Sequence, residues 1–477
     1  MTPPPRVVIQ ARYDAAQTTD ANRRHWTSAD NLSADAANSA SVRRTIRSRA
    51  RYEIANNSYA RGLVVTLADY VVGDGPLLQM LTDDDDYNSA IEAAFGRWAD
   101  SIFFAEKLRT MHMAAVGDGE SVGLFVTRRR PVDPCTLDIR LVECDRLASP
   151  TLLPIPREVD GIRLDESGEP LAYTILREHP GSNLLLAVDF DEYPAAQVLH
   201  YFRPDRPEQH RGVSQLSPSL PLYALLRRYG LAVLNAAETA ANAQIVIHTD
   251  APANEDDTHE PPAAGDPFFL SPEGATFLPN QWDMTGFQPT QPTTSHKEFV
   301  GQVLREIGRA QCVPYNIVAG DSSDYNYASG QLDKQMFFLD VGVNQQRLRS
   351  MVVDRTFDEW GREAAMVPGY LEPQHAARLR AERPDHSWLW TKPEHVDPEK
   401  EAYGQHIRLN EAKTSNLAIE CGRLGHRWRD VVLQRAKIDK FVASLREPGT
   451  AGGEEPAEAR GLAHAVAMEL RRMHDED

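Results

Sequence analysis

The chain has 477 residues, of which 42% are hydrophobic and 25% are charged, and its formal net charge is −18. This length and composition indicate a folded protein of about three domains. The negative balance argues against a protein that holds DNA or an anionic membrane by electrostatic attraction, but not against DNA that passes through without being held.

Two further features bear on the compartment. The four cysteines lack CxxC spacing, which predicts reduced thiols in a cytosolic protein. The start MTPPPRVVIQ has no apolar core of a signal peptide, and no apolar run approaches the ~18 residues of a membrane span. We therefore expect a protein made inside a cell, with no membrane segment.

The N-terminal part changes character near Ser41. Residues 1–40 are rich in Pro, Ala, Asp, Asn, Ser and Thr and hold few large apolar side chains, which predicts a flexible arm. From Ser41, apolar residues recur at helical spacing up to Gly73 and Gly75, which suit a helix stop. Five arginines between positions 43 and 51 cannot share one helix face. Part of their charge must therefore meet acidic neighbours or a polyanion.

Helices and turns are expected next. Four aspartates from Asp83 precede a helical pattern, where acidic residues favour a helix start, and they lack the spacing and the glycine of a calcium loop. The segment GDGESVG at 117–123 has glycines like those of a phosphate-binding loop. It follows a helix and opens a strand, which is the reverse of the order that such a loop needs. We therefore predict a turn.

Residues 136–201 have the pattern of a small β-region. Side chains alternate in TLDIRLVE, and GIRLDESGEPLAYTILRE predicts two strands joined by a turn at Asp165–Gly168. With LLLAVDF and QVLHYF we expect five or six short strands, which form a small sheet or sandwich packed on helices. Three prolines and a glycine at 203–220 then predict an exposed linker.

Long helices dominate the pattern after this linker. We expect them over 219–244, where the second half is rich in alanine, over 294–310 and over 328–365. An acidic, proline-rich loop and a hairpin around Pro272–Gly274 separate the first two. The apolar residues in register along the third helix are Leu332, Met336, Leu339 and Val343.

The C-terminal part is also predicted to be helical. Asp397 is a good N-cap for a helix that begins at Pro398, and Thr414 or Ser415 starts a second, short helix. A third helix is expected over 425–445, and a last amphipathic one around 459–473.

The segment CVPYNIVAGDSSDYNYASGQLDK, from Cys312 to Lys334, interrupts the helical half. Its hydroxyl and carboxylate side chains could belong to a catalytic loop, a metal loop or a structural finger. The chain has no HExxH, no Cys/His cluster and no P-loop, so we assign no catalytic residue, metal ligand or cofactor. The alternative that stays open is a metal-dependent enzyme acting on nucleic acid, with Asp321 and Asp324 as ligands.

Four separated motifs carry a resemblance to a known family. They are HWTSADNLSADAANSASVRRTIRSRARYEIANNSYARGLVVTLADYVVGDG, RGVSQLSPSL, VPYNIVAGDSSDYNYASGQ and VDPEKEAYGQHIRLNEAKTSNLAIECGR. In this order, and over about residues 12–440, the chain resembles the portal proteins of tailed bacteriophages of the lambda type.

The resemblance implies an α+β, mostly helical portal fold that is assembled as a ring and has no enzymatic activity. Its parts are a wing, a stem, a clip and a crown. Mapped by order, we expect a flexible arm (1–40), a wing of helices and a small sheet (41–215), a stem helix (216–244), a clip (245–293), a second stem helix (294–311), a tunnel loop (312–329), a long helix and further wing (330–390), a helical crown (391–446) and a flexible tail with a terminal helix (447–477).

The resemblance also implies a function. Portal proteins form a ring, usually a dodecamer, at one vertex of the virion head, and DNA is packaged and later ejected through its channel. The expected partners are copies of the same chain, the terminase large subunit, a head-completion or tail connector protein, the major capsid and scaffold proteins, and double-stranded DNA. No cofactor is expected. The expected locations are the head vertex and, during assembly, the host cytoplasm.

The same resemblance suggests which residues face the DNA channel. The tunnel loop would contribute Asp321, Ser322, Ser323, Asp324, Tyr325, Asn326 and Tyr327. The stem would contribute Arg227, Arg228, Glu238, Arg305 and Arg309. A ring of such acidic subunits repels the phosphate backbone overall, so DNA could slide without being trapped.

Overall fold

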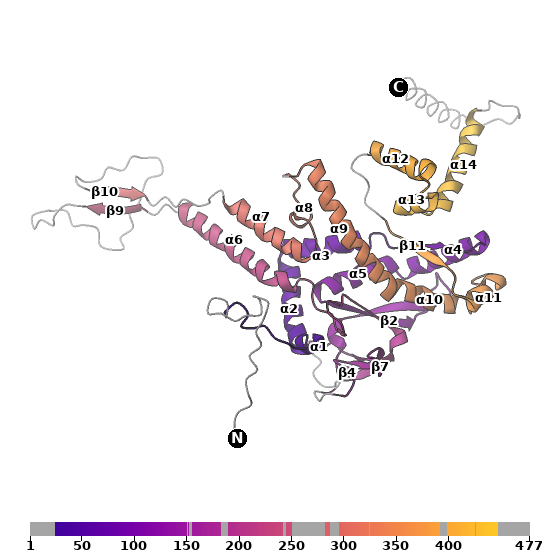
Figure 1. Ribbon diagram of the computed structural model, residues 1–477, viewed down its shortest axis with the longest axis horizontal. Coiled ribbons are helices and arrows are strands. Elements are labelled where there is room, and N and C mark those ends of the chain that lie inside the picture. The colour runs from indigo at the N-terminus through magenta and orange to yellow at the C-terminus, as the bar shows by residue number, and fades with distance from the viewer. Residues whose placement is uncertain are drawn as a thin grey trace, which may run out of the picture.

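The computed structural model describes residues 24–149, 151, 155–182, 189–241, 245–249, 282–286, 295–323, 325–391, 398–424 and 426–446. Figure 1 shows a helical body that holds small sheets, a pair of helices projecting from it, and a C-terminal group of helices on another side. Within these residues, no helix combines the length and the apolar character needed to cross a membrane.

Five helices open the described chain: α1 (Ala34–Ala37), α2 (Ala40–Asn56), α3 (Ser58–Val71), α4 (Asp85–Ser101) and α5 (Phe104–Gly117). The helix predicted from Ser41 is thus two helices. The break lies at Asn57, because its side chain accepts hydrogen bonds from the backbone N–H groups of Tyr59 and Ala60 and so caps α3. Asp84 caps α4 in the same way, which confirms the predicted helix start at the aspartate run.

Ordered structure begins earlier than the predicted boundary at residue 41. The Ser33 side chain caps α1 by accepting from the N–H of Ala36, and Asn38 donates to the carbonyl of Arg211 at 2.9 Å. A flexible arm up to residue 40 is therefore wrong for α1 and the start of α2, because these side chains supply hydrogen bonds that composition does not reveal.

Two small antiparallel sheets follow, with strand orders β3-β2-β8 and β4-β5-β6-β7. The turn predicted at 117–123 is confirmed only at Asp118 and Gly119, which connect α5 to β2; the other residues of that range belong to these two elements. The predicted pair of strands around Asp165–Gly168 is confirmed as β5 and β6, whereas most of LLLAVDF lies outside the described residues. The strands are β2 (Glu120–Thr127), β3 (Leu137–Val142), β4 (Glu158–Val159), β5 (Ile162–Leu164), β6 (Pro170–Leu176), β7 (Phe190–Pro194) and β8 (Val198–Phe202).

The exposed linker predicted at 203–220 is wrong in its second half. Pro204 and Pro207 are exposed, but Arg211, Ser214 and Leu216 are buried. The reason is electrostatic: Arg211 is drawn into the body by a buried carboxylate described below, and the backbone after it follows. A single 3-10 turn, Ser217–Ser219, then leads into the next helix.

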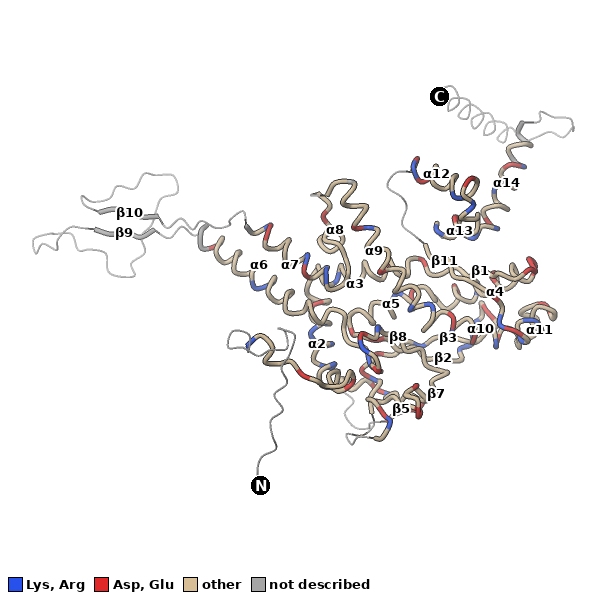
Figure 2. Tube along the Cα trace, in the orientation of Figure 1, with Lys and Arg blue, Asp and Glu red and all other residues tan. Residues whose placement is uncertain are grey.

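Helices α6 (Leu220–Ala241) and α7 (Ser295–Ala310) project side by side from the body (Figure 1). The rings of Tyr229 and Phe299 join them, with centroids 4.3 Å apart. Between them in the chain, strands β9 (Ile245–Thr249) and β10 (Trp282–Gly286) pair antiparallel. The hairpin predicted around Pro272–Gly274 lies outside the described residues. Figure 2 shows that most of α6 carries no charged residue.

The chain returns to the body through α8 (Tyr315–Ala319) and α9 (Tyr327–Leu348). A π-helical turn, Arg349–Val353, joins α9 to α10 (Asp354–Ala364), so the predicted long helix 328–365 is confirmed in extent. Helix α11 (Pro373–Ala381) follows, and β11 (His386–Leu389) pairs antiparallel with β1 (Leu77–Met80).

The C-terminal group consists of α12 (Pro398–His406), a π turn (Ile407–Glu411), α13 (Leu417–Arg423) and α14 (Trp428–Arg446). The predicted first residue Pro398 is confirmed, whereas Asp397 lies outside the described residues. The short helix begins later than predicted, because the side chain that caps it belongs to Asn416, which accepts from the N–H of Ile419 at 2.9 Å. Residues 459–473 also lie outside the described part.

The main core lies where α4, α5 and α10 meet. Aromatic rings interlock there edge to face, with centroids 5.2 Å apart for Phe95 and Trp360 and 5.5 Å apart for Phe95 and Trp388. A second, smaller core between the two sheets contains Val122, Ile162 and other apolar strand residues. The long helix α9 rests on the main core through Phe337, Val341 and Leu348, which lie between its middle and its last residue.

Candidate functional site

The segment predicted as a tunnel loop over 312–329 is shorter than expected, because it contains helix α8 and the first turn of α9. Gly320 ends α8 in the left-handed region, with φ of 64°. The loop proper then covers 320–326. Asn326 closes it with a reciprocal cap: its side chain accepts from the N–H of Ser329 at 2.8 Å, and the Ser329 hydroxyl accepts from the N–H of Asn326 at 3.2 Å.

The tip of this loop is polar, and its sequence contains no Lys or Arg. Ser322 and Ser323 are exposed, and Asp321 accepts from the N–H of Ser323 at 2.9 Å, which lowers the pKa of its carboxyl. Burial, followed by the nearby Asp333 carboxyl, raises the pKa of the half-buried Tyr325. Asp324 and the side chain of Tyr327 lie outside the described residues, and so does the geometry of the alternative metal pair Asp321/Asp324.

The predicted stem residues have different environments. Arg227 does not lie free: it donates to both carboxylate oxygens of Glu53 on α2, at 2.9 and 3.0 Å, and so ties α6 to the body. Arg305 lies over the ring of Tyr315, 4.4 Å from its centroid. The remaining three are exposed and form no ion pair among the described residues: Arg228, Glu238 and Arg309.

Helix α9 is apolar on two opposite faces. The four apolar residues that the sequence pattern aligned along this helix are exposed and do not face the core. The residues that face the core are Phe337, Val341 and Leu348. We call the exposed set the α9 stripe. Its spacing of four, three and four residues places it on one helix face. It consists of Leu332 (63% exposed), Met336 (64%), Leu339 (74%) and Val343 (57%).

A buried charge cluster lies where α2 meets the sheets, and sequence reasoning missed its centre. Glu120 is fully buried at the start of β2. Its carboxylate accepts from Arg211 at 2.6 Å, Arg47 at 3.0 Å and the N–H of Gly212 at 3.0 Å, and it lies 3.1 Å from Nε2 of His200. Burial alone would raise the pKa of Glu120, but Arg211 and His200 outweigh it and hold the pKa well below its usual range.

The cluster extends along one face of α2. Arg43 pairs with Asp160 at 2.6 Å, and Arg51 pairs with both Asp118 and Asp145 at 2.7 Å. The prediction that part of the arginine charge meets acidic neighbours is therefore confirmed. The signal in the sequence was the spacing of four between positions 43, 47 and 51, which puts these arginines on one face. The acidic partners are 67 to 117 residues away and carried no signal.

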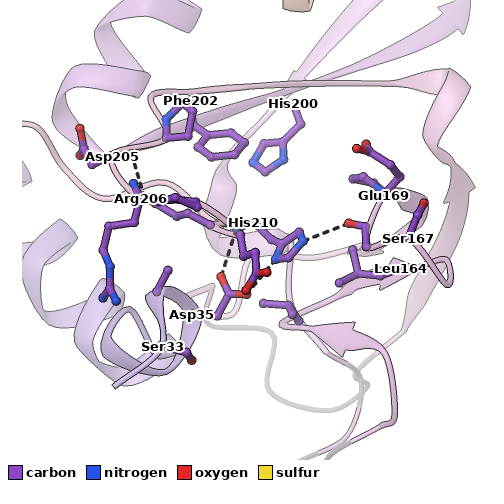
Figure 3. Close-up of a pocket in the computed structure, with 18 of the residues that line it drawn as sticks. Ser33, Asp35, Leu164, Ser167, Glu169, His200, Phe202, Asp205, Arg206 and His210 are labelled. Carbon is purple, nitrogen blue, oxygen red and sulfur yellow. Dashed lines mark hydrogen bonds and ion pairs between the residues drawn. The ribbon is translucent and has the colours of Figure 1, made fainter. Parts of the chain in front are cut away.

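An open cleft of about 1060 Å³ lies beside this cluster, between α1, the turn from β5 to β6 and the loop that follows β8 (Figure 3). His210 lies at its edge. Its Nδ1 is 2.8 Å from the carboxylate of Asp35 on α1, and its Nε2 is 3.1 Å from the carbonyl of Gly168. Within the described part of the chain, no group of three or more His, Cys, Asp or Glu side chains is placed to hold a metal.

Comparisons with known proteins show which family the sequence matches. The sequence model of the phage portal proteins of the lambda family matches residues 19–335. The probable portal protein of Halomonas phage phiHAP-1 is 26% identical over 458 residues, which cover 88% of this chain and 84% of that protein.

Two solved structures also match. A chain from the neck of an empty GTA particle, computed with C6 symmetry, has a TM-score of 0.44 at 16% identity and covers 79% of this chain and 92% of its own. A chain from the virion of a native gene transfer agent particle has a TM-score of 0.40 at 15% identity, with the same coverage. Since the family model spans well over half of the sequence, the chain belongs to the lambda family of phage portal proteins.

Proposed function

We propose that copies of this portal protein close into a ring, of twelve subunits as expected for the family, at one vertex of a phage head. Double-stranded DNA enters the head through the central channel of this ring, driven by the terminase, and later leaves through it. The protein itself contributes no catalytic step in this proposal. It assembles with its own copies in the host cytoplasm and remains at the head vertex of the virion.

The α9 stripe is the observation that best supports assembly into a ring. Four large apolar side chains on one helix face are exposed in a single chain, while the opposite face of the same helix packs on the core. An exposed apolar patch of this kind marks an interaction site. In the proposed ring a neighbouring copy covers the stripe, because every copy carries the same unpartnered face and a closed ring leaves none of them exposed.

The element order supports the assignment of parts. Helices α6 and α7 project as a pair and would form the stem, and β9 with β10, inserted between them in the chain, would belong to the clip. The remaining helices and the two sheets before α6, together with α9 to α11, would form the wing. The C-terminal helices α12 to α14 would form the crown.

The loop 320–326 is proposed to face the passing DNA. It is held at both ends by the Gly320 and Asn326 caps, which suits a short finger with a fixed base. Its exposed hydroxyls can hydrogen-bond to phosphate, and the absence of Lys or Arg from its sequence avoids a strong grip on the DNA. Arg228, Glu238 and Arg309 would be the stem residues that remain available to the channel.

The proposed partners follow from the position of the ring. The terminase large subunit and the connector proteins would dock at the clip end, and the major capsid and scaffold proteins would surround the wing. These assignments rest on membership of the family and on the order of the elements.

The proposed ring can be tested by measuring the mass of the assembled particles. Light scattering coupled to size exclusion should give particles of many times 53.3 kDa, and negative-stain micrographs should show rings with a central hole. A protein that stays monomeric at every concentration and salt, or that forms open filaments, would contradict the proposal.

A further inference from the structure

The cleft beside the charge cluster has a floor and a rim of different chemistry. Its floor is apolar and aromatic: Leu164, Tyr173 and Phe202 line it, and the ring of His200 lies 4.6 Å from that of Phe202. At about 1060 Å³ it exceeds the ~300–1,000 Å³ of an ordinary small-molecule site. Its size and open shape suit a stretch of polypeptide.

The rim of the cleft is acidic. Four carboxylates line it against two guanidinium groups. Both guanidinium groups are already engaged: Arg355 donates to the carbonyls of Val198 and Ala195, and Arg206 donates to that of Leu32. The acidic residues at the rim are Asp35, Glu169, Asp205 and Glu208.

Two of these four carboxylates have no basic partner among the described residues. Asp35 faces His210, and Asp205 pairs with Arg203 at 2.8 Å. Glu169 and Glu208 are exposed and make no ion pair with any described residue. A fitting occupant therefore carries apolar side chains for the floor and two positive charges for these carboxylates.

The N-terminal end of the same chain has this chemistry. The stretch PRVVIQARY, residues 5–13, contains three branched aliphatic residues and a tyrosine, with Arg6 and Arg12 each one residue from an end, and no acidic residue occurs in residues 1–13. We propose that segment 5–13 of each subunit binds in that subunit's own cleft, with its apolar side chains on the floor and its two arginines at Glu169 and Glu208.

The position of the cleft favours the subunit's own segment. Ser33, Ala34 and Asp35 at the start of α1 form one wall, and segment 5–13 precedes them closely in the sequence. The 20 residue-to-residue steps from Tyr13 to Ser33 span at most ~66–72 Å, far more than the cleft requires. Tethering gives the segment an effective concentration on the order of mM, so a weak intrinsic affinity is enough to fill the cleft.

A cysteine pair in the full-length chain tests this binding. Ser167 lines the cleft on the turn from β5 to β6 (Figure 3). Cys312, the one exposed cysteine, is first replaced by Ser. Val8→Cys with Ser167→Cys should then form a disulfide, read by mass spectrometry after mild oxidation. The matched control is Val8→Cys with Ser48→Cys, since Ser48 is exposed on α2 but lies outside the cleft lining. We expect the first pair to close at least tenfold faster.

Charge reversal separates specific binding from mere proximity. Glu169→Arg with Glu208→Arg should lower the rate to that of the control pair, and adding Arg6→Glu with Arg12→Glu should restore it. Circular dichroism and thermal unfolding verify that each variant is folded. Equal rates of disulfide formation for the two cysteine pairs, or a rate that does not change when the charges of Glu169 and Glu208 are reversed, would overturn the proposal. A disulfide that forms only between two differently tagged chains would also overturn it, because the segment would then occupy a neighbour's cleft.

Discussion

Two residues on helix α9, two positions apart, should respond in opposite ways to substitution. Leu339 belongs to the α9 stripe and is 74% exposed, whereas Phe337 is fully buried and meets the ring of Tyr70 edge to face at 5.0 Å. If a neighbouring subunit covers the stripe, Leu339→Glu removes apolar burial from the ring interface. If the main core depends on the other face, Phe337→Ala lowers the stability of the single chain.

The magnitudes can be worked out from the exposed fractions. Burying a whole Leu side chain is worth ~1.5–3 kcal/mol, so covering the exposed part of Leu339 is worth ~1–2 kcal/mol. A carboxylate left unpaired in the interface adds ~2 kcal/mol or more. Together they weaken each interface by ~3 kcal/mol, which is about a hundredfold in the association constant. The free energy of unfolding of the single chain should change by less than ~0.5 kcal/mol, because the site is exposed there.

The partner variant has the reverse profile. Phe337→Ala leaves a cavity in the core and should lower the free energy of unfolding by ~3–5 kcal/mol. It leaves the α9 stripe intact, so any ring that still forms should have the same subunit number. Urea unfolding monitored by tryptophan fluorescence measures stability, and light scattering over a concentration series measures assembly.

A control variant places the same charge elsewhere. Val132 is 84% exposed in the loop between β2 and β3, so Val132→Asp adds a carboxylate at an exposed apolar site outside the α9 stripe. It should assemble as the wild type does. Normal ring formation by Leu339→Glu, or an equal loss with Val132→Asp, would refute the assignment of the stripe to a subunit interface.

Three further results are expected from the described geometry. Gly119→Ala should lower the free energy of unfolding by ~2–5 kcal/mol, because its φ is +97° and an added Cβ would clash with the backbone of Val213 and Ser214. At Gly168, with φ of +89° but open space, the same change should cost only ~1–2 kcal/mol; equal losses in thermal unfolding would contradict this reasoning. Burial lowers the pKa of His112 to about 4, below its unfolded value near 6.5. The unfolded chain therefore binds this proton first, so the free energy of unfolding is unaffected by His112 above pH 6.5 and falls by ~3 kcal/mol as the pH drops to 4. His112→Gln, which can still accept from the Tyr201 hydroxyl, should flatten that slope in urea unfolding at pH 7 and 4.5, and an unchanged slope would show that other groups cause it. Deleting Ser322–Tyr325 should leave rings intact but reduce the DNA retained in heads, as measured by nuclease protection; failure to form rings would make the loop an assembly element.

Local signals in the sequence were sufficient wherever a structure depends on neighbouring residues. The turn at Asp165–Gly168 follows from its own residues, and helix α7, Ser295–Ala310, lies within one residue of the range 294–310 that its pattern predicted. The break between α2 and α3 was missed, because Asn57 is compatible with a helix interior until its side chain is seen to cap the next helix.

The remaining errors have a physical cause in partners that are distant or absent. The repeat along α9 was detected, but both faces of that helix are apolar, so the spacing alone does not distinguish the face that packs on the core from the exposed α9 stripe. The segment containing Arg211 looked like a linker because the carboxylate that draws it inward, Glu120, lies 91 residues earlier. The cleft was not predicted for the same reason, because its walls come from three segments that are distant in the sequence: α1, the turn from β5 to β6 and the loop after β8.

The charge cluster explains how the projecting helix pair can be held in a fixed direction. Arg211 lies nine residues before the first residue of α6, and its guanidinium is tied to Glu120 at the first residue of β2. Arg227, two turns into α6, is tied to Glu53 near the end of α2. Apolar contacts are non-directional and tolerate sliding, whereas paired guanidinium and carboxylate groups are satisfied in few orientations. Buried ion pairs add little net stability, but losing one partner costs several kcal/mol. The buried tie of Arg211 to Glu120 before α6 and the partly exposed tie of Arg227 to Glu53 within it therefore restrict the angle of this helix against the body more than they raise the stability of the fold. A proposed channel that must stay aligned while DNA moves through it needs that restriction.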